Sequence, residues 1–360
     1  MSDINKNKKV LVAMSGGVDS AVATLLLRSE GYEVGGITMK VWSECERICD
    51  ELETTPDDNI TDAKKTAELL GIPHYSLALG DSFRRCVIDR FIDDYACGKT
   101  PNPCVECNKH LKFGKLFEEA KRLGYNYLAT GHYARIEQDE NDRYLLKKAL
   151  DDAKDQSYFL WSIDKALLGN IIFPLGSYTK PEIRVIAAEN NFSNAHRSDS
   201  QDICFIPDGD YISFIGKNTD LTFPKGDFID TEGNILGKHE GIIRYTIGQR
   251  KGLGIAVGYP IFVGKKDAER NTVTLCSDRE LYSTELFATD VNLLSCDKIE
   301  NGTRLLAKIR YRHTPAPATV SMTSDGRLHV LFDEPQRAIC SGQSVVLYDG
   351  DTVVGGGIIE

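Results

Sequence analysis

The chain contains 360 residues, of which 43 are Lys or Arg and 53 are Asp or Glu, and its formal net charge is −10. This length exceeds that of a single hydrophobic core and predicts two or three domains. The acidic balance excludes a nonspecific polyanion binder with a uniformly basic surface, and no apolar run approaches the roughly 18 residues of a membrane span. We therefore expect a cytoplasmic enzyme that makes no membrane contact and keeps its ten cysteines mostly as thiols.

The first half of the chain alternates between strand and helix patterns. Apolar, β-rich runs predict strands at 8–14, 33–41, 74–79 and 125–133. Helical spacing predicts helices at 18–31, 60–72, 81–98, 113–124 and 179–191. This alternation predicts an α/β domain with a doubly wound parallel sheet and helices on both faces, which we place at 1–206.

The second half is rich in glycines and turns, and helical periodicity is nearly absent. Short β-rich runs predict strands within 241–254, 260–275, 303–313, 317–323, 328–333 and 344–359. They favour small barrels, and we place a central β domain at 207–280 and a C-terminal β-barrel domain at 281–360. The predicted strand 303–313 carries Arg304, Lys308, Arg310 and Arg312, which form either a solvated strand face or a local surface for a folded RNA.

The stretch SGGVDS, residues 15–20, joins the first predicted strand to the first predicted helix. Gly16 and Gly17 allow a sharp turn and close approach of an anion, to which the helix amino terminus presents unpaired N–H groups. Two serines add hydroxyl groups, and Asp19 can hold Mg²⁺ or cap the helix. The lysine of a Walker loop is missing. The alternative is an ordinary strand-to-helix turn. Two serines, two glycines and an aspartate in six positions argue against this alternative.

Two cysteine segments lie far apart in the sequence. NPCVECN, residues 102–108, places Cys104 and Cys107 in a C-x-x-C spacing, which fits a metal site, a redox pair or one catalytic thiol with a bystander. SDSQDICFIPDGDY, residues 198–211, carries Cys204. The spacing alone leaves the three alternatives open.

A resemblance narrows the choice. SGGVDS resembles the PP-loop of the ATP pyrophosphatase superfamily, whose members cleave ATP between its α and β phosphates to adenylate a substrate oxygen. In order along the chain, AMSGGVDS, TPNPCVECNKHLKF, LATGHYAR, KDQSYFLW, SQDICFI, YTIGQRKGLG, RYRH and SGQSVVLY resemble the tRNA-specific 2-thiouridylases. The resemblance implies ATP-dependent adenylation of C2 of the wobble uridine of tRNAs for Glu, Gln and Lys, and then replacement of its oxygen by sulfur.

The resemblance also implies roles for individual positions. Cys107 is the nucleophile and Cys204 carries the persulfide, which a cysteine desulfurase or a sulfur-relay protein supplies. Lys109 and His110 are expected to lower the pKa of Cys107. The implied nucleotide contacts are Ala13, Met14, Ser15, Gly16, Gly17, Val18, Asp19, Ser20, Met39 and Gly131, with Mg²⁺ bound through Asp19. The implied contacts to the target base and the tRNA are Asn102, Pro103, Cys104, His132, Lys154, Asp155, Gln156, Arg310, Tyr311 and Gln343.

The chain departs from the family pattern at Cys104, where many members have an aspartate. Cys104 is then an incidental small residue, or it joins Cys107 and Cys204 as a ligand of a [4Fe-4S] cluster that delivers sulfide. We favour the persulfide route, because two cysteines at the family's positions already complete it. Cys45 and Cys49 lie in an acidic insertion at 43–59 and receive no role. The rival functions are another PP-loop ligase or amidotransferase-type enzyme and a non-enzymatic RNA- or metal-binding module.

Overall fold

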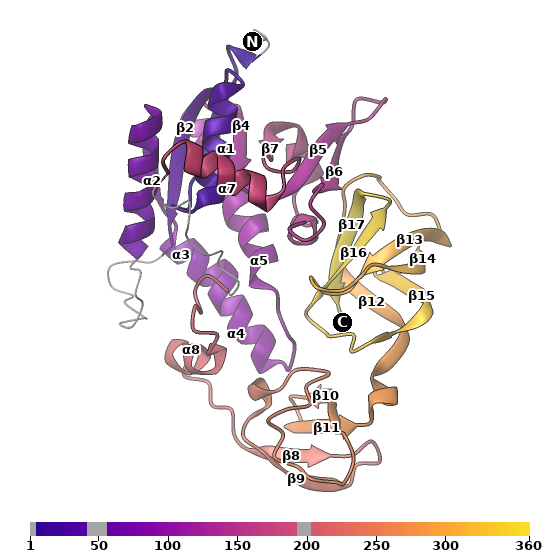
Figure 1. Ribbon diagram of the computed structural model, residues 1–360. Helices are drawn as coiled ribbons and strands as arrows, with labels where there is room; N and C mark the ends of the chain where they lie inside the picture. The colour runs from indigo at the N-terminus through magenta and orange to yellow at the C-terminus, as the bar shows by residue number, and fades with distance from the viewer. Residues whose placement is uncertain (1–4, 42–55, 193–202) are drawn as a thin grey trace. The chain divides into compact units, whose positions relative to one another are not determined.

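The computed structural model describes residues 5–41, 56–192 and 203–360 (Figure 1). The contacts between residues divide the chain into two compact units. The first comprises Met1–Val87, Cys104–Gln201 and Asp351–Val353. The second comprises Ile88–Pro103, Asp202–Gly350 and Val354–Glu360. The predicted segment 43–59, with Cys45 and Cys49, lies largely outside the described residues.

The first unit is built on a five-stranded parallel sheet. Its strands, in spatial order, are β3 (His74–Ala78), β2 (Glu33–Lys40), β1 (Lys9–Ala13), β4 (Tyr127–Thr130) and β7 (Ile171–Ile172). The chain builds outward from β1 through β2 to β3 and then returns to the other side of β1 with β4. The carboxyl ends of β1 and β4 therefore flank a topological switch point, where open parallel sheets place their ligand sites.

Helices cover both faces of this sheet. The helices of the first unit are α1 (Val18–Ser29), α2 (Pro56–Leu70), α3 (Gly80–Phe83), α5 (Pro103–Glu106), α6 (Leu116–Arg122) and α7 (Lys180–Glu189), with most of the π-helix η2 (Arg84–Ile88), the π-helix η3 (Cys107–Lys115) and the 3₁₀ turns η4 (Ser157–Phe159) and η5 (Lys165–Asn170). Val10 and Val12 of β1 pack against Leu27 of α1 and Ala67 of α2. Leu11 points to the opposite face and is also fully buried. The predicted doubly wound α/β domain is confirmed.

Two local predictions in the first unit need correction. The helix predicted at 113–124 starts ten residues earlier, because α5, η3 and α6 form one continuous helical run from Pro103. The chain after β4 forms an unpredicted hairpin of β5 (Ala134–Gln138) and β6 (Tyr144–Lys148). Thr352 of β17 pairs with Lys147 of β6, which explains why Asp351–Val353 belong to the first unit.

The second unit begins with α4 (Asp89–Ala96) and contains a small central sheet. Its strands, in spatial order, are β10 (Phe262–Asp267), β11 (Thr272–Cys276), β8 (Gly226–Ile229) and β9 (Ile235–His239). A helix, α8 (Tyr211–Asn218), precedes them and packs on α4 through the stacked rings of Tyr95 and Tyr211. The sequence did not predict α8. The strand predicted within 241–254 is wrong, since this segment forms the 3₁₀ turn η6 (Ile242–Arg244) and loops.

A closed antiparallel barrel completes the second unit. The 3₁₀ turn η7 (Asp278–Leu281) leads into its strands, which are, in spatial order, β12 (Tyr282–Leu293), β15 (Leu328–Arg337), β14 (Ala316–Met322), β13 (Thr303–Lys308), β16 (Ser344–Asp349) and β17 (Thr352–Ile359). Pairing of β12 with β17 closes the barrel. A Cβ on Gly355 would lie 2.3 Å from the carbonyl oxygen of Asn292, so the seam requires glycine there. The predicted C-terminal barrel is confirmed, whereas the boundaries predicted at 206 and 280 stay predictions.

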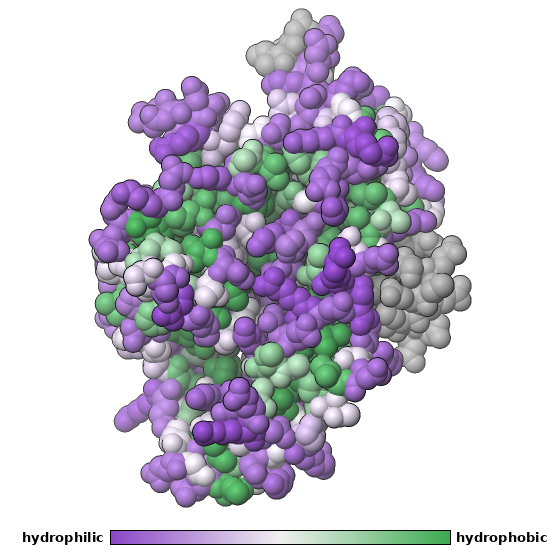
Figure 2. Space-filling model, turned by 180° about the vertical axis from the view of Figure 1, so that it is seen from behind, coloured by the Kyte–Doolittle hydropathy of each residue, from purple (hydrophilic) through white to green (hydrophobic). Residues whose placement is uncertain are grey.

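None of the helices in the described parts of the chain is long and apolar enough to span a membrane. Hydrophilic side chains cover most of the face shown in Figure 2, with smaller hydrophobic areas between them.

Candidate active site

The glycine loop lies at the carboxyl end of β1 and leads into α1. Gly16 has a φ of +75°, and a Cβ there would lie 2.5 Å from the carbonyl oxygen of Asn59 in α2. The Ser20 hydroxyl donates to the carbonyl of Gly17 at 3.0 Å and accepts from the amide of Ser15 at 3.2 Å. Gly17, at the N-cap of α1, has no side chain to cap the helix, and its own amide donates to the Ser15 hydroxyl at 3.4 Å. The loop is therefore held from within, and the start of α1 remains available to an anion.

Two predicted nucleotide contacts lie on strands beside this loop. Gly131 directly follows β4, and a Cβ on it would lie 3.0 Å from the backbone carbon of Asp19 and 3.0 Å from the amide nitrogen of Ser20. Met39 lies near the carboxyl end of β2, which pairs with β1. Among the predicted loop residues, Met14 joins the sheet through its amide, which donates to the carbonyl of Ile37. These residues share the switch-point edge of the sheet, as expected for a nucleotide site.

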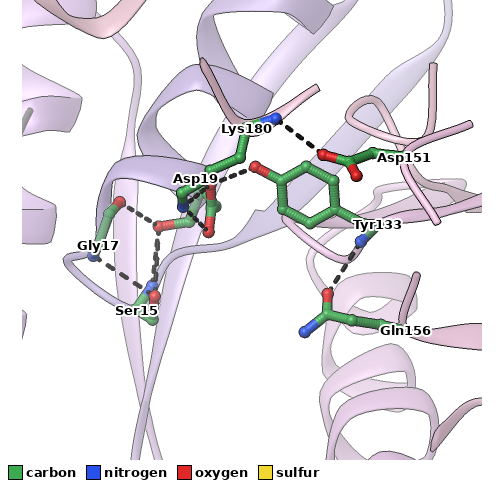
Figure 3. A network of polar contacts seen from close by, with 8 residues as sticks. Ser15, Gly17, Asp19, Tyr133, Asp151, Gln156 and Lys180 are labelled. Carbon is green, nitrogen blue, oxygen red and sulfur yellow. Dashed lines mark hydrogen bonds and ion pairs between the residues drawn. The ribbon is translucent and has the colours of Figure 1, made fainter. Parts of the chain in front are cut away.

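Asp19 is the centre of a polar network in this unit (Figure 3). The Lys180 ammonium lies 2.7 Å and 2.8 Å from its two carboxylate oxygens. The Tyr133 hydroxyl donates to the first of these oxygens at 2.8 Å. The backbone amide of Tyr133 donates to the side-chain oxygen of Gln156 at 2.9 Å. The network therefore connects the loop to the segment that follows β4, to α7 and to the predicted tRNA-contacting segment.

Most of the first cysteine segment lies on a helical run that begins at Pro103. Cys104 falls in α5 and Cys107 opens η3, so the two side chains are three residues apart on one helical run and share a face. A π-helix at this position is a feature often found at functional sites. Burial raises the pKa of both thiols, and the Lys112 ammonium lowers it in part. The Cys107 side chain is half-buried, whereas Cys104 is exposed.

The prediction that Lys109 and His110 lower the pKa of Cys107 is wrong. His110 lies 3.3 Å from Glu106, its partner one turn earlier. The cation that acts on Cys107 is Lys112, and burial outweighs its effect on the pKa. Burial thus favours the protonated thiol of Cys107.

Lys112 also determines the state of His132. The Lys112 ammonium lies 3.2 Å from Nε2 of His132, and the Thr130 hydroxyl lies 2.6 Å from Nδ1. Because an ammonium only donates, Nε2 accepts and Nδ1 carries the proton. Burial and Lys112 hold the pKa of His132 well below its usual range. His132 is a neutral, oriented imidazole next to Gly131.

Cys204 lies in a turn of the second unit. The amide of Ile206 donates to the carbonyl of Ile203, and the rings of Phe205 and Phe214 lie 5.1 Å apart in the interior. Phe205 also meets Phe91 of α4 edge-on, whereas the Cys204 side chain is exposed. The turn is therefore anchored beside a cysteine that reaches solvent. All eight cysteines in the described ranges are thiols.

The predicted tRNA-contacting segment 154–156 belongs to the first unit. Asp155 is only 5% exposed, and its carboxylate accepts from the amides of Ala149 and Ser157 and from the Ser157 hydroxyl. This carboxylate therefore shapes the loop, while Lys154 and Gln156 are less buried. Any contact of Asp155 with tRNA is expected to be indirect.

The remaining predicted tRNA contacts lie in the second unit. Strand β13 ends at Lys308, so Arg310 and Tyr311 lie in a turn and not in the predicted strand. Arg310 donates to the carbonyl of Arg337 at 3.0 Å. Arg304, by contrast, is paired with Asp333, and this contact neutralises one charge of the basic run.

Gln343 and the predicted base contacts Asn102 and Pro103 also belong to the second unit. The amide nitrogen of Gln343 donates to the carbonyls of Thr100 at 2.8 Å and Pro101 at 3.4 Å. The amide of Thr100 in turn donates to the carbonyl of Ser341. The barrel thus holds the backbone that leads into the first cysteine segment.

Sequence reasoning missed three residues of this site. Lys180, Tyr133 and Lys112 received no role, although each contacts a predicted site residue. Lys180 carried one weak signal, since a lysine at the first position of a helix is opposed by the helix dipole. Among residues 5–41, 56–192 and 203–360, no group of three or more His, Cys, Asp or Glu side chains is placed to hold a metal ion. The iron–sulfur alternative stays a prediction.

The loop, Asp19 and the switch-point sheet together define a nucleotide-binding α/β domain of the PP-loop type, joined to a central β-rich region and a barrel. Descriptions of known families match successive parts of the chain: "tRNA methyl transferase HUP domain" over residues 8–208, "tRNA methyl transferase PRC-barrel domain" over 213–277 and "Aminomethyltransferase beta-barrel domain" over 283–359.

Curated relatives match nearly the whole chain. The tRNA-specific 2-thiouridylase MnmA of Clostridioides difficile (strain 630) is 48% identical over 98% of each chain. That of Acetivibrio thermocellus is 49% identical over 98% of this chain and 99% of its own. The chain belongs to the family of tRNA-specific 2-thiouridylases, and the predicted resemblance is confirmed. A solved 4-thiouridine synthetase–RNA complex with bound ATP is 16% identical, with a TM-score of 0.35 over 59% of this chain and 50% of that one, which is too weak to carry an argument.

Proposed function

We propose that this protein is an ATP-dependent tRNA 2-sulfurtransferase that converts the wobble uridine of tRNA to 2-thiouridine. The observation that carries the proposal is the near-full-length identity to curated tRNA-specific 2-thiouridylases. The rival function of another PP-loop ligase or amidotransferase-type enzyme leaves Cys107 and Cys204 without a use. The rival function of a non-enzymatic binding module leaves the nucleotide loop without a use.

In the activation step, ATP binds at the glycine loop, and the C2 oxygen of the uridine attacks its α-phosphate. The O–P bond to the uridine forms, the bond between the α and β phosphates breaks, and pyrophosphate leaves. The residues that hold ATP are Ala13, Met14, Ser15, Gly16, Gly17, Val18, Asp19 and Ser20, with Met39 and Gly131. The amide groups at the start of α1 and the serine hydroxyls face the phosphates.

Asp19 fits the role of a Mg²⁺ ligand. Its carboxylate oxygens are hard donors of the kind that Mg²⁺ prefers, and Asp19 lies in the first turn of α1, directly after the glycine loop. When bound, the metal would offset the charge of the pyrophosphate leaving group. Asp19 itself is already oriented by Tyr133 and Lys180.

In the sulfur step, the terminal sulfur of a Cys204 persulfide attacks C2 of the adenylated uridine, and AMP leaves with the former C2 oxygen. The Cys107 thiolate then attacks the inner sulfur of the persulfide. The S–S bond of the persulfide breaks, its electron pair stays on the sulfur bound to C2, and a Cys107–Cys204 disulfide forms. A cellular thiol reductant restores both thiols. Lys112 lowers the pKa of Cys107 and so favours its thiolate.

Recognition of tRNA is local, since the chain as a whole is acidic. Asn102, Pro103 and Cys104 lie against the target base together with His132. Lys154, Gln156, Arg310, Tyr311 and Gln343 contact the rest of the tRNA, and the buried carboxylate of Asp155 shapes the loop that carries Lys154 and Gln156. The substrates are the tRNAs for Glu, Gln and Lys. A cysteine desulfurase or a sulfur-relay protein supplies the persulfide, and the reaction takes place in the cytoplasm.

The test is reconstitution with purified protein, ATP, Mg²⁺, bulk tRNA and a persulfide donor. We expect 2-thiouridine in the digested tRNA, together with AMP and pyrophosphate in equal amounts. Asp19→Ala should abolish AMP formation, because the lost carboxylate would hold the Mg²⁺ that offsets phosphate charge. Circular dichroism checks that the variant stays folded after the Lys180 ammonium loses its contact to Asp19. AMP formation that does not depend on tRNA, or that continues unchanged in the variant, would contradict the proposal.

A further inference from the structure

Lys180 is a buried lysine whose ammonium points at the nucleotide loop (Figure 3). The residue is 6% exposed, and its Nζ contacts both carboxylate oxygens of Asp19, 161 positions away in the sequence. Nζ also lies 5.8 Å from the centre of the Tyr133 ring. A long lysine side chain normally extends to water, so its burial here requires an explanation.

The backbone of Lys180 is fixed independently of its charge. The preceding residue, Thr179, forms a capping box with Glu182 at the start of α7. The amide of Lys180 donates to the Asp151 carboxylate at 3.2 Å. The stem of the lysine therefore starts from an anchored position.

The charge of Lys180 does not serve α7 itself. A cation in the first turn of a helix is opposed by the positive end of the helix dipole. Burial of an ammonium adds a desolvation penalty that only a close anion offsets. The Lys180 ammonium is thus unfavourable for α7, and the favourable interaction that offsets this is its contact with Asp19.

Two side chains, one neutral and one cationic, contact the Asp19 carboxylate. Its Oδ1 accepts from the Tyr133 hydroxyl and from Lys180, whereas its Oδ2 accepts from Lys180. Tyr133 is neutral and 3% exposed, so it keeps the carboxylate oriented without competing for its charge. If Lys180 turned away, Asp19 would keep its orientation and offer Oδ2 to a metal ion.

We propose that Lys180 is a positioning residue that exchanges partners during nucleotide binding: it neutralises Asp19 before ATP arrives, and it turns to the phosphate oxygens of ATP when Asp19 takes up Mg²⁺. The triphosphate brings several negative charges to a site that already contains a carboxylate, so the departing ammonium finds a new anion next to the old one. The proposal rests on the assignment of Mg²⁺ to Asp19.

The test compares Lys180→Met, Asp19→Asn and the double variant by calorimetric titration with Mg²⁺·ATP and by thermal melting with Mg²⁺ alone. Loss of a charge-assisted contact to phosphate should raise the Kd for Mg²⁺·ATP about 10- to 100-fold in Lys180→Met. Mg²⁺ alone should raise the Tm of Lys180→Met, in which Asp19 has lost its cation, and should raise the Tm of wild type far less. Lys147→Met removes a lysine that is paired with Glu137 and Asp351 away from the loop, and it should leave the Kd unchanged.

The double variant separates a phosphate contact from simple neutralisation of Asp19. If Lys180 contacts phosphate, the double variant binds ATP about 10- to 100-fold more weakly than Asp19→Asn does. Equal affinity of these two variants would overturn the proposal. The double variant removes both charges of the pair, and thermal melting checks that Asp19→Asn, in which the buried Lys180 ammonium loses the Asp19 carboxylate, stays folded. If Asp19→Asn binds Mg²⁺·ATP as wild type does, the metal assignment itself fails, independently of Lys180.

Discussion

The close approach of Gly131 to the nucleotide loop allows a quantitative prediction for Gly131→Ala. The new Cβ would lie 3.0 Å from the backbone carbon of Asp19 and 3.1 Å from its Cβ. Carbon atoms pack at about 3.5–4.0 Å, so the loop must move by about half an ångström or more. Overpacking of this kind costs about 1–3 kcal/mol. If the displaced loop cannot close on ATP, the same free energy appears in binding as about a 5- to 150-fold higher Kd.

The assay is calorimetric titration of ATP with Mg²⁺ and without tRNA, so that no turnover occurs. Gly216→Ala is a matched control, because Gly216 lies within α8 and a Cβ added to it would have no atom within 4 Å. That substitution should leave ATP binding unchanged and should stabilise α8 by about 0.5–1 kcal/mol. A Gly131→Ala protein that melts normally and binds ATP within twofold of wild type would refute the assignment of Gly131 to the nucleotide site.

Three further outcomes are expected. Serine at Cys107 or Cys204 should eliminate 2-thiouridine while ATP and tRNA still bind. Cys104→Asp should keep a near-normal yield of 2-thiouridine in anaerobically prepared protein. If this variant loses both the yield and its bound iron, the cluster route is favoured. Because burial raises the pKa of Cys107, the rate of single-turnover sulfur transfer should increase with pH. Lys112→Met should shift this pH–rate profile to higher pH, and an unshifted profile would remove Lys112 from the mechanism. Arg310→Ala should weaken tRNA binding and reduce its salt slope by about one, whereas an unchanged slope would place the tRNA elsewhere.

The sequence predicted the sheet and the nucleotide loop well because both depend on local signals. An apolar strand, two glycines and an amphipathic helix in direct succession specify the β1–α1 turn with little help from the rest of the chain. The helical run through the first cysteine segment was predicted to start only at residue 113. Proline is favourable at the first position of a helix, and Pro103 opens α5. The missed start therefore had one local signal, which fits a turn equally well.

The contacts of Asp19 could not be predicted, since they join residues distant in the sequence. Nothing in the pattern around Lys180 or Tyr133 specifies which carboxylate either side chain meets. The missed helix α8 has a similar cause. It is eight residues long and is stabilised by aromatic packing on α4, which short-range periodicity does not report.

Three consecutive residues after β4 connect three parts of the first unit to which the proposed function assigns a role. Gly131 lies against the backbone of Asp19, His132 contacts Lys112 beside the first cysteine segment, and Tyr133 contacts both Asp19 and Gln156. One short segment therefore contacts all three partners at once. A displacement of this segment must therefore affect the nucleotide loop, the thiol environment and the predicted tRNA-contacting segment together. Substitutions at these three positions should consequently show non-additive effects on ATP affinity, in contrast to pairs of sites that share no partner.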